Sequence, residues 1–415
     1  MTRAAVSRGV LVTDLVTALE RHEATAWGYS LEHRKGECQD AVMSMRSQLP
    51  LLWLCGAPAT GKSTVAWQVF DDLGDQGLWV GYLDIDQIGM LQPPPDGDPR
   101  CHRFKVDNLA AMVRNYRAAG TQVLVISGVI DPELGHDFAE VAVDAAITFC
   151  HLTVDEANLR ERLGARGWPL EAADEAMTMM SGLADAPFVT TTIDTTGRDP
   201  AGLAREAASL VTPASSTPDA QELLECSAGD VTFIIGPRAV GKSAVSWGMA
   251  MREWISGERT VYVDLDQVGF LRPEPSDASL QAANLGVIWR NALSRGANRL
   301  IANGMVTTNE NLAILRHAVR PAPVHTLRLT ANPDTLWERI RARCAGGPAR
   351  LINDDLENAT PEVQRQVHRV AVDQHVAYAA SNLGDAVIDT TNLDIEQAIG
   401  EAFKTHAQQT TQRNP

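Results

Sequence analysis

The sequence of 415 residues predicts an α/β protein with two copies of one domain, preceded by an N-terminal helical extension. Two observations lead to this fold class. Several segments of the first half recur in the same order in the second half. Within each copy, short apolar runs alternate with segments of helical character. Strands that are separated by helices imply a mostly parallel sheet with helices on both faces.

Each copy begins with an apolar run typical of a buried strand, and the later elements follow in the same order. The first copy reads LLWLCG (51–56), a helix over 64–74, the strand-like WVGYLDID (79–86), a helix over 108–120 and VLVISG (123–128). The second reads VTFIIG (231–236), a helix over 244–257, TVYVDLD (260–266), a helix over 284–296 and LIANG (300–304). The two orders match, so the copies are expected to share one topology.

Repeated segments set the domain boundaries. LDIDQIGML recurs as VDLDQVGFL, NLAAMVRNYRAAG as NLGVIWRNALSRG, LRERLGARG as LWERIRARC, and TIDTTG as VIDTTN. Between the copies, TPASSTPDA has the composition of an interdomain linker. We therefore expect a first domain over 50–212, a linker over 213–221 and a second domain over 222–415.

Residues 1–49 have no counterpart in the second half. Leu11, Leu15 and Leu19 follow a helical spacing, which predicts a helical extension packed on the first domain. The N-terminal residues carry charges where a secretory signal needs an apolar stretch, so a cytoplasmic protein is expected. No apolar run approaches the roughly 20 residues that cross a membrane, which argues against a membrane partner.

The charge and cysteine content exclude several classes of function. A formal net charge of −16 argues against a nucleic-acid partner, because affinity for nucleic acid depends mainly on Lys and Arg contacts to phosphate. The six cysteines are scattered without a C-x-x-C pair, which argues against a disulfide framework and a structural zinc site. Reduced, buried thiols are expected.

The strongest motif is a glycine-rich loop that occurs twice, as GAPATGKST (56–64) and GPRAVGKSA (236–244). Both fit G-x-x-x-x-G-K-[ST], the P-loop, in which backbone N–H groups and a helix N-terminus surround phosphate. Lys62 and Lys242 are expected to reach the β/γ-phosphates of ATP, and Ser63 and Ser243 to hold Mg²⁺. The expected nucleotide-binding residues are Gly56, Ala57, Ala59, Thr60, Gly61, Lys62, Ser63 and Thr64 in the first loop, and Gly236, Arg238, Ala239, Val240, Gly241, Lys242, Ser243 and Ala244 in the second. Two loops in register predict two tandem P-loop NTPase domains.

A second repeated motif places two carboxylates at the end of a predicted strand. Asp84 and Asp86 recur as Asp264 and Asp266. Alternate strand residues point to one side, so both carboxylates can face the phosphates. One carboxylate can complete the Mg²⁺ shell through water, and the other can accept the proton of an attacking hydroxyl. A solvated acidic turn is the alternative, and the repetition disfavours it.

With these loops, the D-x-D motifs and the segments LRERLGARG and LWERIRARC, the sequence resembles the P-loop small-molecule kinases, including the shikimate, gluconate and adenylylsulfate kinases. The resemblance implies that Asp86 and Asp266 are catalytic bases beside Lys62 and Lys242. It also implies that Asp84 and Asp264 associate with magnesium, and that an arginine-bearing lid closes over ATP. The lid arginines would be Arg162, Arg166, Arg339 and Arg343. A solvated Glu/Arg helix is the alternative for the arginine segments.

We therefore expect a phosphotransferase that moves the γ-phosphate of ATP to a small hydroxyl-bearing molecule. A nucleotide-dependent switch or scaffold of kinase ancestry is the alternative. No run of four apolar residues is followed by Asp-Glu, which argues against an AAA-type or helicase-like machine. Arg114-Asn115 recurs as Arg290-Asn291, where either acceptor binding or an exposed helix face would fit.

The segment after D-x-D-Q differs between the copies. The first copy carries Arg100, His102, Arg103 and Lys105, whereas the second has Glu274, Ser276, Asp277 and Gln281 in this region. Cations beside the acceptor site would favour an anionic acceptor in the first domain only. A mobile surface loop with solvated charges is the alternative.

Overall fold

The computed structural model describes residues 48–135, 137–138, 144–169, 171–215, 218–219, 229–345, 356 and 359–413. The helical extension expected over 1–49 falls outside these ranges up to residue 47, and the linker expected over 213–221 falls outside them in part. We call 48–215 the first half and 229–413 the second half.

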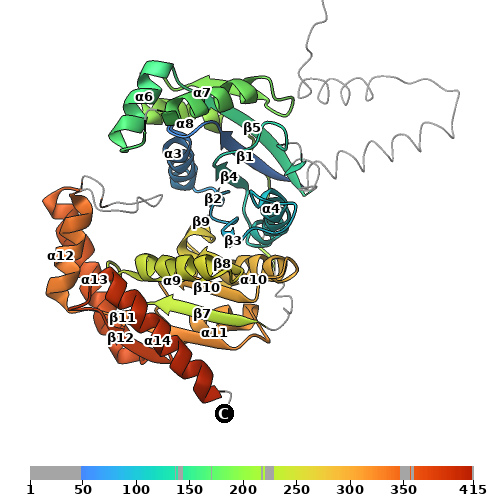
Figure 1. Ribbon diagram of the computed structural model, residues 1–415. Coiled ribbons are helices and arrows are strands. Elements are labelled where there is room, and N and C mark those ends of the chain that lie inside the picture. The colour runs from blue at the N-terminus through green and yellow to red at the C-terminus, as the bar shows by residue number, and fades with distance from the viewer. Residues whose placement is uncertain are drawn as a thin grey trace, which may run out of the picture. The chain divides into compact units, whose positions relative to one another are not determined.

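The first half alternates strands and helices in the order expected from its apolar runs (Figure 1). Its elements are β1 (Leu49–Cys55), α3 (Lys62–Asp75), β2 (Val80–Asp84), β3 (Leu91–Gln92), α4 (His102–Ala118), β4 (Val123–Ser127), β5 (Ala145–Thr153), α6 (Glu156–Ala165), α7 (Glu171–Ala184), β6 (Thr191–Asp194) and α8 (Pro200–Ala208). The central strands are buried along nearly their whole length, as a sheet covered on both faces requires.

The second half follows the same order, with η1 and α11 as additional described elements. Its elements are β7 (Asp230–Ile235), α9 (Lys242–Ser256), β8 (Thr260–Asp264), the 3₁₀ turn η1 (Leu265–Gln267), β9 (Phe270–Arg272), α10 (Ser279–Leu293), β10 (Arg299–Gly304), α11 (Asn309–Ala318), β11 (Val324–Thr330), α12 (Pro333–Cys344), α13 (Pro361–Ser381), β12 (Ala386–Asp389) and α14 (Ile395–Arg413). The prediction of mixed α/β structure with parallel sheets and helices is confirmed.

Each half is built on a six-stranded sheet whose last strand comes from the other half. The strand orders are β6-β5-β1-β4-β2-β9 and β12-β11-β7-β10-β8-β3. Within each half the pairs are parallel, whereas the two exchanged strands pair antiparallel. Tyr82 of β2 lies opposite Phe270 of β9, and Val261 of β8 lies opposite Leu91 of β3. We call this arrangement the edge-strand exchange, and the sequence analysis did not predict it.

Helices cover both faces of each sheet. Apolar residues of α3 and α8 pack with β1, β2 and β4 on one face of the first sheet. Residues of α9 and α14 cover the corresponding face of the second sheet. On the other faces, α4 and α10 pack against each other, and one apolar cluster runs through both halves. The two halves therefore share part of their core.

Four asparagines join α4 to α10 inside this contact. Asn115 donates to Asn284 over 2.9 Å, and Asn291 donates to Asn108 over 2.8 Å. Asn108 and Asn284 in turn donate to the carbonyls of Ile88 and Val268, just after the two acidic motifs. Asn115 and Asn291 are thus partly buried in the contact between the halves, whereas Arg114 is exposed, as the alternative of an exposed helix face predicts. The repetition of this residue pair reflects a paired contact between the halves.

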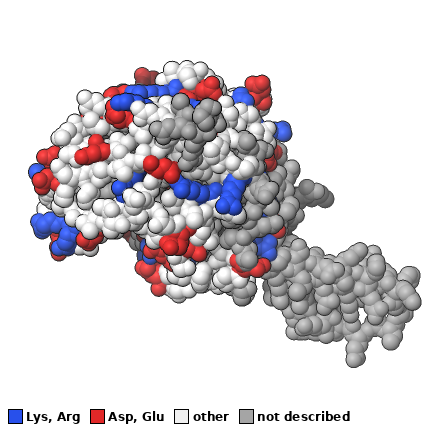
Figure 2. Space-filling view, turned by 90° about the horizontal axis from the view of Figure 1, so that it is seen from below, with Lys and Arg blue, Asp and Glu red and all other residues white. Residues whose placement is uncertain are grey.

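On the face that Figure 2 presents, Lys and Arg side chains are interspersed with Asp and Glu among uncharged residues. Among the described helices, none is both long enough and apolar enough to span a membrane. Cys55, Cys101 and Cys150 are buried free thiols, and Cys344 is a partly buried one.

Candidate functional site

The two glycine-rich loops have the same backbone conformation. The φ angles of Gly56, Ala59 and Gly61 are 148°, 63° and 95°, and those of Gly236, Ala239 and Gly241 are 150°, 62° and 99°. A Cβ on Gly56 would lie 2.6 Å from the carbonyl oxygen of Leu152, and one on Gly236 would lie 2.5 Å from that of Leu329. Only glycine fits at the start of each loop. Both alanines adopt a left-handed conformation that non-glycine residues rarely take, a strain typical of functional loops.

Each loop opens a helix whose N-terminal amides have no capping side chain. Gly61 precedes α3 and Gly241 precedes α9, and neither provides a side-chain acceptor. By contrast, Asp155 caps α6 and Asn332 caps α12. Uncapped N–H groups together with the helix dipole attract an anion.

The loop lysines fold back onto their own loops. The Nζ of Lys62 donates to the carbonyl of Ala57 over 2.6 Å, and that of Lys242 donates to the carbonyl of Pro237 over 3.1 Å. Burial lowers the pKa of Lys62 to about 8, although the charges of Asp86 and Asp84 oppose this shift. Burial also lowers the pKa of Lys242. An anion beside either ammonium would raise its pKa again.

The acidic pairs end β2 and β8, as the D-x-D motif predicts. In each pair the first carboxylate accepts a hydrogen bond from the backbone of the second residue, over 2.9 Å for Asp84 and 3.1 Å for Asp264. Burial, followed by the charge of the neighbouring aspartate, raises the pKa of both Asp84 and Asp264 to about 6. Both aspartates are buried, which argues against the alternative of a solvated acidic turn. A divalent cation beside them would reverse the shift in pKa.

Hydroxyl and amide groups complete the surroundings of these carboxylates. Ser243 of the second loop donates to Asp264 over 3.3 Å, which brings together the two predicted magnesium residues of that half. Asn303, at the end of β10, donates to the same carboxylate oxygen over 2.9 Å. In the first half Ser127, at the end of β4, donates to Asp84 over 3.3 Å. Ser127 and Asn303 thus support the acidic pair, a role that the sequence analysis did not assign.

The second aspartates of the two pairs differ in their partners. Lys105 of α4 lies 2.6 Å from Asp86, which remains partly exposed. The matching position in the second half is Gln281, which donates to the carbonyl of Leu265 instead. Asp266 accepts a hydrogen bond from the backbone of Met305. The two candidate bases therefore have different electrostatic surroundings.

The predicted lid arginines fall into two kinds. Arg162 of α6 donates to the loop carbonyl of Ala59 and to Thr195, at 3.2–3.3 Å. Arg339 of α12 makes similar contacts at 2.7–3.0 Å, with Thr390 and with the carbonyl of Val240, which lies one position further along its loop than Ala59 does. These two arginines connect the P-loop to the turn after β6 or β12.

The other two arginines act on the lysines through charge. Arg166 ends α6 and is exposed, and its positive charge contributes to lowering the pKa of Lys62. Arg343 of α12 has the same effect on the pKa of Lys242. In each half a guanidinium charge therefore acts on the loop lysine.

Two residues of α13 make polar contacts in the second half that the sequence analysis missed. Gln374 accepts a hydrogen bond from the loop amide of Arg238 over 2.8 Å, and Tyr378 accepts one from Val306. In the first half, apolar residues of α7 pack against the loop. The corresponding loop position there is Pro58, which has no amide hydrogen to donate. No repeated segment covers α13, so the sequence offered no signal for these contacts.

Most of the predicted acceptor-site cations of the first half have acidic partners. Arg100 pairs with Asp131, His102 with Asp137, and Lys105 with Asp86. Arg100 is 81% exposed, whereas His102 and Lys105 are largely covered. The cations of this segment are therefore not all solvated, and Lys105 is the one that contacts an acidic-pair residue.

Residues 52–179 match a family model described as an AAA domain. No curated protein matches the chain. Similar solved structures include a tunicamycin resistance protein from Deinococcus radiodurans, at 20% identity and a TM-score of 0.32, covering 40% of this chain and 99% of that one. A gluconokinase from Sinorhizobium meliloti 1021 matches at 15% identity and a TM-score of 0.29, covering 39% of this chain and 90% of that one. A shikimate kinase from Acinetobacter baumannii, in complex with shikimate, matches at 16% identity and a TM-score of 0.28, covering 40% of this chain and 93% of that one.

The matched range runs from β1 into α7 and includes the first P-loop, the first acidic pair and α6. β4 ends at Ser127 and is followed by Gly128, so no Asp-Glu pair follows this strand. The first half contains a P-loop domain, and the chain resembles the P-loop small-molecule kinases.

Proposed function

We propose that the chain binds ATP and Mg²⁺ at both P-loops and transfers the γ-phosphate of ATP to a small hydroxyl-bearing molecule, in at least the first half. The observation that carries the proposal is the matched geometry of the two sites. Each has a loop with left-handed residues and an uncapped helix N-terminus. Each also has a loop lysine, buried in the first half and partly buried in the second, whose pKa responds to the charges of an acidic pair.

The residues suit the magnesium ion and the nucleotide that the P-loop implies. Mg²⁺ prefers oxygen ligands, and Ser243 and Asp264 present a hydroxyl and a carboxylate 3.3 Å apart. Ser63 and Asp84 are the corresponding residues in the first half. When bound, the nucleotide with Mg²⁺ supplies the phosphoryl group and neutralises part of its charge.

The chain's own residues would then position the reactants. Lys62 would exchange its bond to the Ala57 carbonyl for a phosphate oxygen, because an anion is the better partner for a buried ammonium. Asp86 would accept the proton of the acceptor hydroxyl, and Lys105, at 2.6 Å, would hold this carboxylate in place. Arg166 would add positive charge beside the moving phosphoryl group.

The second candidate function is a nucleotide-dependent switch or scaffold. The edge-strand exchange favours it, because β3 and β9 each follow an acidic motif closely and pair with the other half. The hydrogen bond from the Arg238 amide to Gln374 also favours it, since a phosphate in the second loop would compete for that amide.

Acceptor-stimulated turnover separates the two functions. ATP consumption by the full chain should be measured with and without a library of hydroxyl-bearing metabolites, using Lys62→Ala and Lys242→Ala as controls. Release of ADP that rises with one acceptor and is lost in Lys62→Ala would support a kinase. ADP release that no acceptor changes would reject the kinase and leave the switch.

We further propose that the two halves differ in acceptor, with an anionic one in the first half, because Lys105 is replaced by Gln281 beside the second acidic pair. Anionic and neutral hydroxyl compounds should be compared in full-length Lys62→Ala and Lys242→Ala, so that one site works at a time. Equal turnover of the same compound by both variants would reject this proposal.

A further inference from the structure

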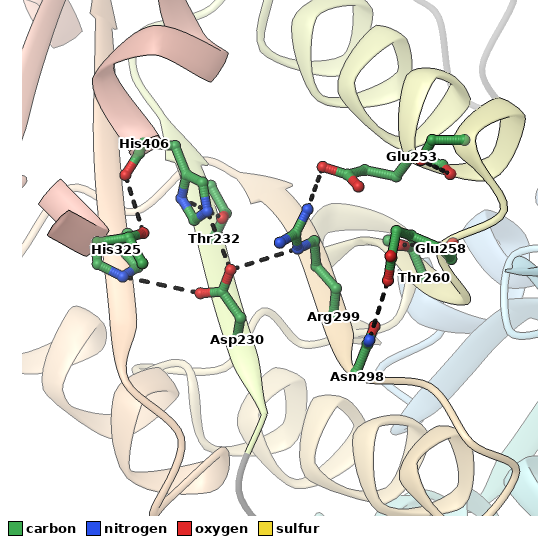
Figure 3. A network of polar contacts seen from close by, with 11 residues as sticks. Asp230, Thr232, Glu253, Glu258, Thr260, Asn298, Arg299, His325 and His406 are labelled. Atoms are coloured by element: carbon green, nitrogen blue, oxygen red, sulfur yellow. Dashed lines mark hydrogen bonds and ion pairs between the residues drawn. The ribbon is translucent and has the colours of Figure 1, made fainter. Parts of the chain in front are cut away.

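Three side chains that commonly bind metals converge at the end of β7 opposite its P-loop (Figure 3). Asp230 is the first residue of β7, His325 lies on the neighbouring strand β11, and His406 lies on α14. One potential ligand atom from each lies within 4.8 Å of the others. Among the described residues, this is a group of three candidate ligands from three separate elements, and it is separate from both P-loops.

The distances suit a small coordination sphere. His406 Nε2 lies 3.0 Å from Asp230 Oδ2, and His325 Nε2 lies 3.8 Å from Asp230 Oδ1. The two imidazole rings are nearly perpendicular, with centroids 5.0 Å apart. A tetrahedral zinc ion with bonds of about 2.0–2.2 Å separates its ligands by roughly 3.3 Å. The observed distances lie on either side of that value, so small side-chain shifts would suffice.

A neighbouring hydroxyl orients one of the histidines. His406 Nδ1 lies 3.2 Å from the hydroxyl of Thr232, which is buried on β7. Metal-binding histidines usually hydrogen-bond through their second nitrogen, because this bond fixes the tautomer and directs the first nitrogen to the metal. A hydroxyl can accept from Nδ1–H, so Thr232 can fulfil this role.

The charges around the cluster also permit a cation. Arg299 lies 3.4 Å from Asp230 Oδ2 and would oppose a metal by itself, but Arg299 is also paired with Glu253. With both histidines neutral, the local balance is one negative charge. His325 and His406 are only 2% and 7% exposed, and an unpaired charge buried at such positions would destabilise the fold.

We propose that Asp230, His325 and His406 bind one divalent transition-metal ion of the zinc class, which ties α14 to β7 and β11. Imidazole ligands favour zinc, copper and nickel over magnesium and calcium, so this site would differ in selectivity from the P-loops. In the register of the two P-loops, the first half has Pro50 in place of Asp230, so the site belongs to the second half alone.

Zinc binding by the chelator-treated full chain tests the proposal. Titration calorimetry with Zn²⁺ should be run in millimolar Mg²⁺, which occupies sites that prefer oxygen ligands. The wild type should bind zinc at a site that His325→Gln and His406→Gln lose. Thr232→Val should weaken that site by about 10–100-fold, as loss of an outer hydrogen-bond partner does. His102→Gln is the matched control, because it removes a histidine that pairs with an aspartate at 3.1 Å and that belongs to no group of three candidate ligands among the described residues.

A second measurement covers ligand variants that fail to fold. Zn²⁺ should raise the melting temperature of the wild type and of His102→Gln, and Co²⁺ should give the visible absorption of a tetrahedral site. Asp230→Asn, which keeps the shape of the side chain, should lose both effects. The proposal is overturned if zinc leaves the wild-type melting temperature unchanged, or if the histidine and Asp230 variants bind zinc as tightly as the wild type.

Discussion

Replacing Phe270 by alanine should destabilise the first half of the chain, although Phe270 belongs to the second. In the edge-strand exchange, Phe270 lies opposite Tyr82, and its ring centroid is 5.0 Å from that of Trp67, 5.8 Å from that of Tyr82 and 6.4 Å from that of Phe70. Its side chain thus completes an aromatic cluster whose other members belong to the first half.

The expected loss follows from these contacts. Truncating a fully buried Phe costs about 3–5 kcal/mol, and Phe270 is only partly buried. Each aromatic pair adds about 0.5–1.5 kcal/mol beyond its buried area, and three pairs are lost. Arg272, 2.5 Å from Asp71, still anchors the strand. We therefore expect the free energy of unfolding to fall by about 2–3 kcal/mol.

Urea unfolding followed by tryptophan fluorescence measures this loss, because Trp67, one of the nine tryptophans, lies in the cluster. Phe270→Met is the matched control: Met90 occupies the corresponding position beside β3 and packs on the second half, so methionine should retain most of the stability. A loss below about 0.5 kcal/mol for Phe270→Ala, within the range of ordinary surface substitutions, would refute the reasoning.

Three further predictions concern the P-loops and the acidic pair. Lys62→Ala and Lys242→Ala should each remove one nucleotide site while the other persists; a single site in wild-type calorimetry would contradict this. Asp86→Asn should leave ATP affinity within a few-fold and reduce acceptor phosphorylation by roughly 10²-fold or more. Equal losses of binding and turnover would instead make Asp86 a magnesium or structural residue. Gly236→Ala should cost about 1–3 kcal/mol in thermal unfolding and weaken nucleotide binding to the second loop, because its φ is 150° and a Cβ would meet the carbonyl of Leu329. Gly257→Ala, with φ of 88° and open space around it, is the control, and an equal effect there would exclude the carbonyl contact as the cause.

Sequence patterns predicted the features that rest on local chemistry. The P-loop needs glycines and a lysine at fixed spacing, and the strand before it needs an apolar run. Both features can therefore be recognised from a single short segment of sequence. The D-x-D motif likewise ends a strand in both halves. Duplication strengthened each of these predictions, because the same local pattern occurred twice in register.

Long-range contacts were beyond the reach of these patterns. The exchanged strands β3 and β9 are two and three residues long, too short for an alternating pattern to mark them. The partners of Asn115 and Asp86 lie on other elements, and Asp230 is separated from His406 by 176 residues. Arg162 was expected on a lid, and only the carbonyls of the folded loop reveal its contact with Ala59.

The edge-strand exchange has a consequence for synthesis on the ribosome. The outer edge of β2 remains unpaired until Phe270–Arg272 has been made. The 188 residues from the end of β2 at Asp84 to Arg272 (272 − 84) take on the order of 10–40 seconds at roughly 5–20 residues per second. An exposed edge strand is a template for pairing with other chains. During this interval, nascent chains on the same messenger can pair with the open edge of β2 before Phe270–Arg272 of the same chain does. Slower translation between the halves lengthens the interval and should therefore favour aggregation.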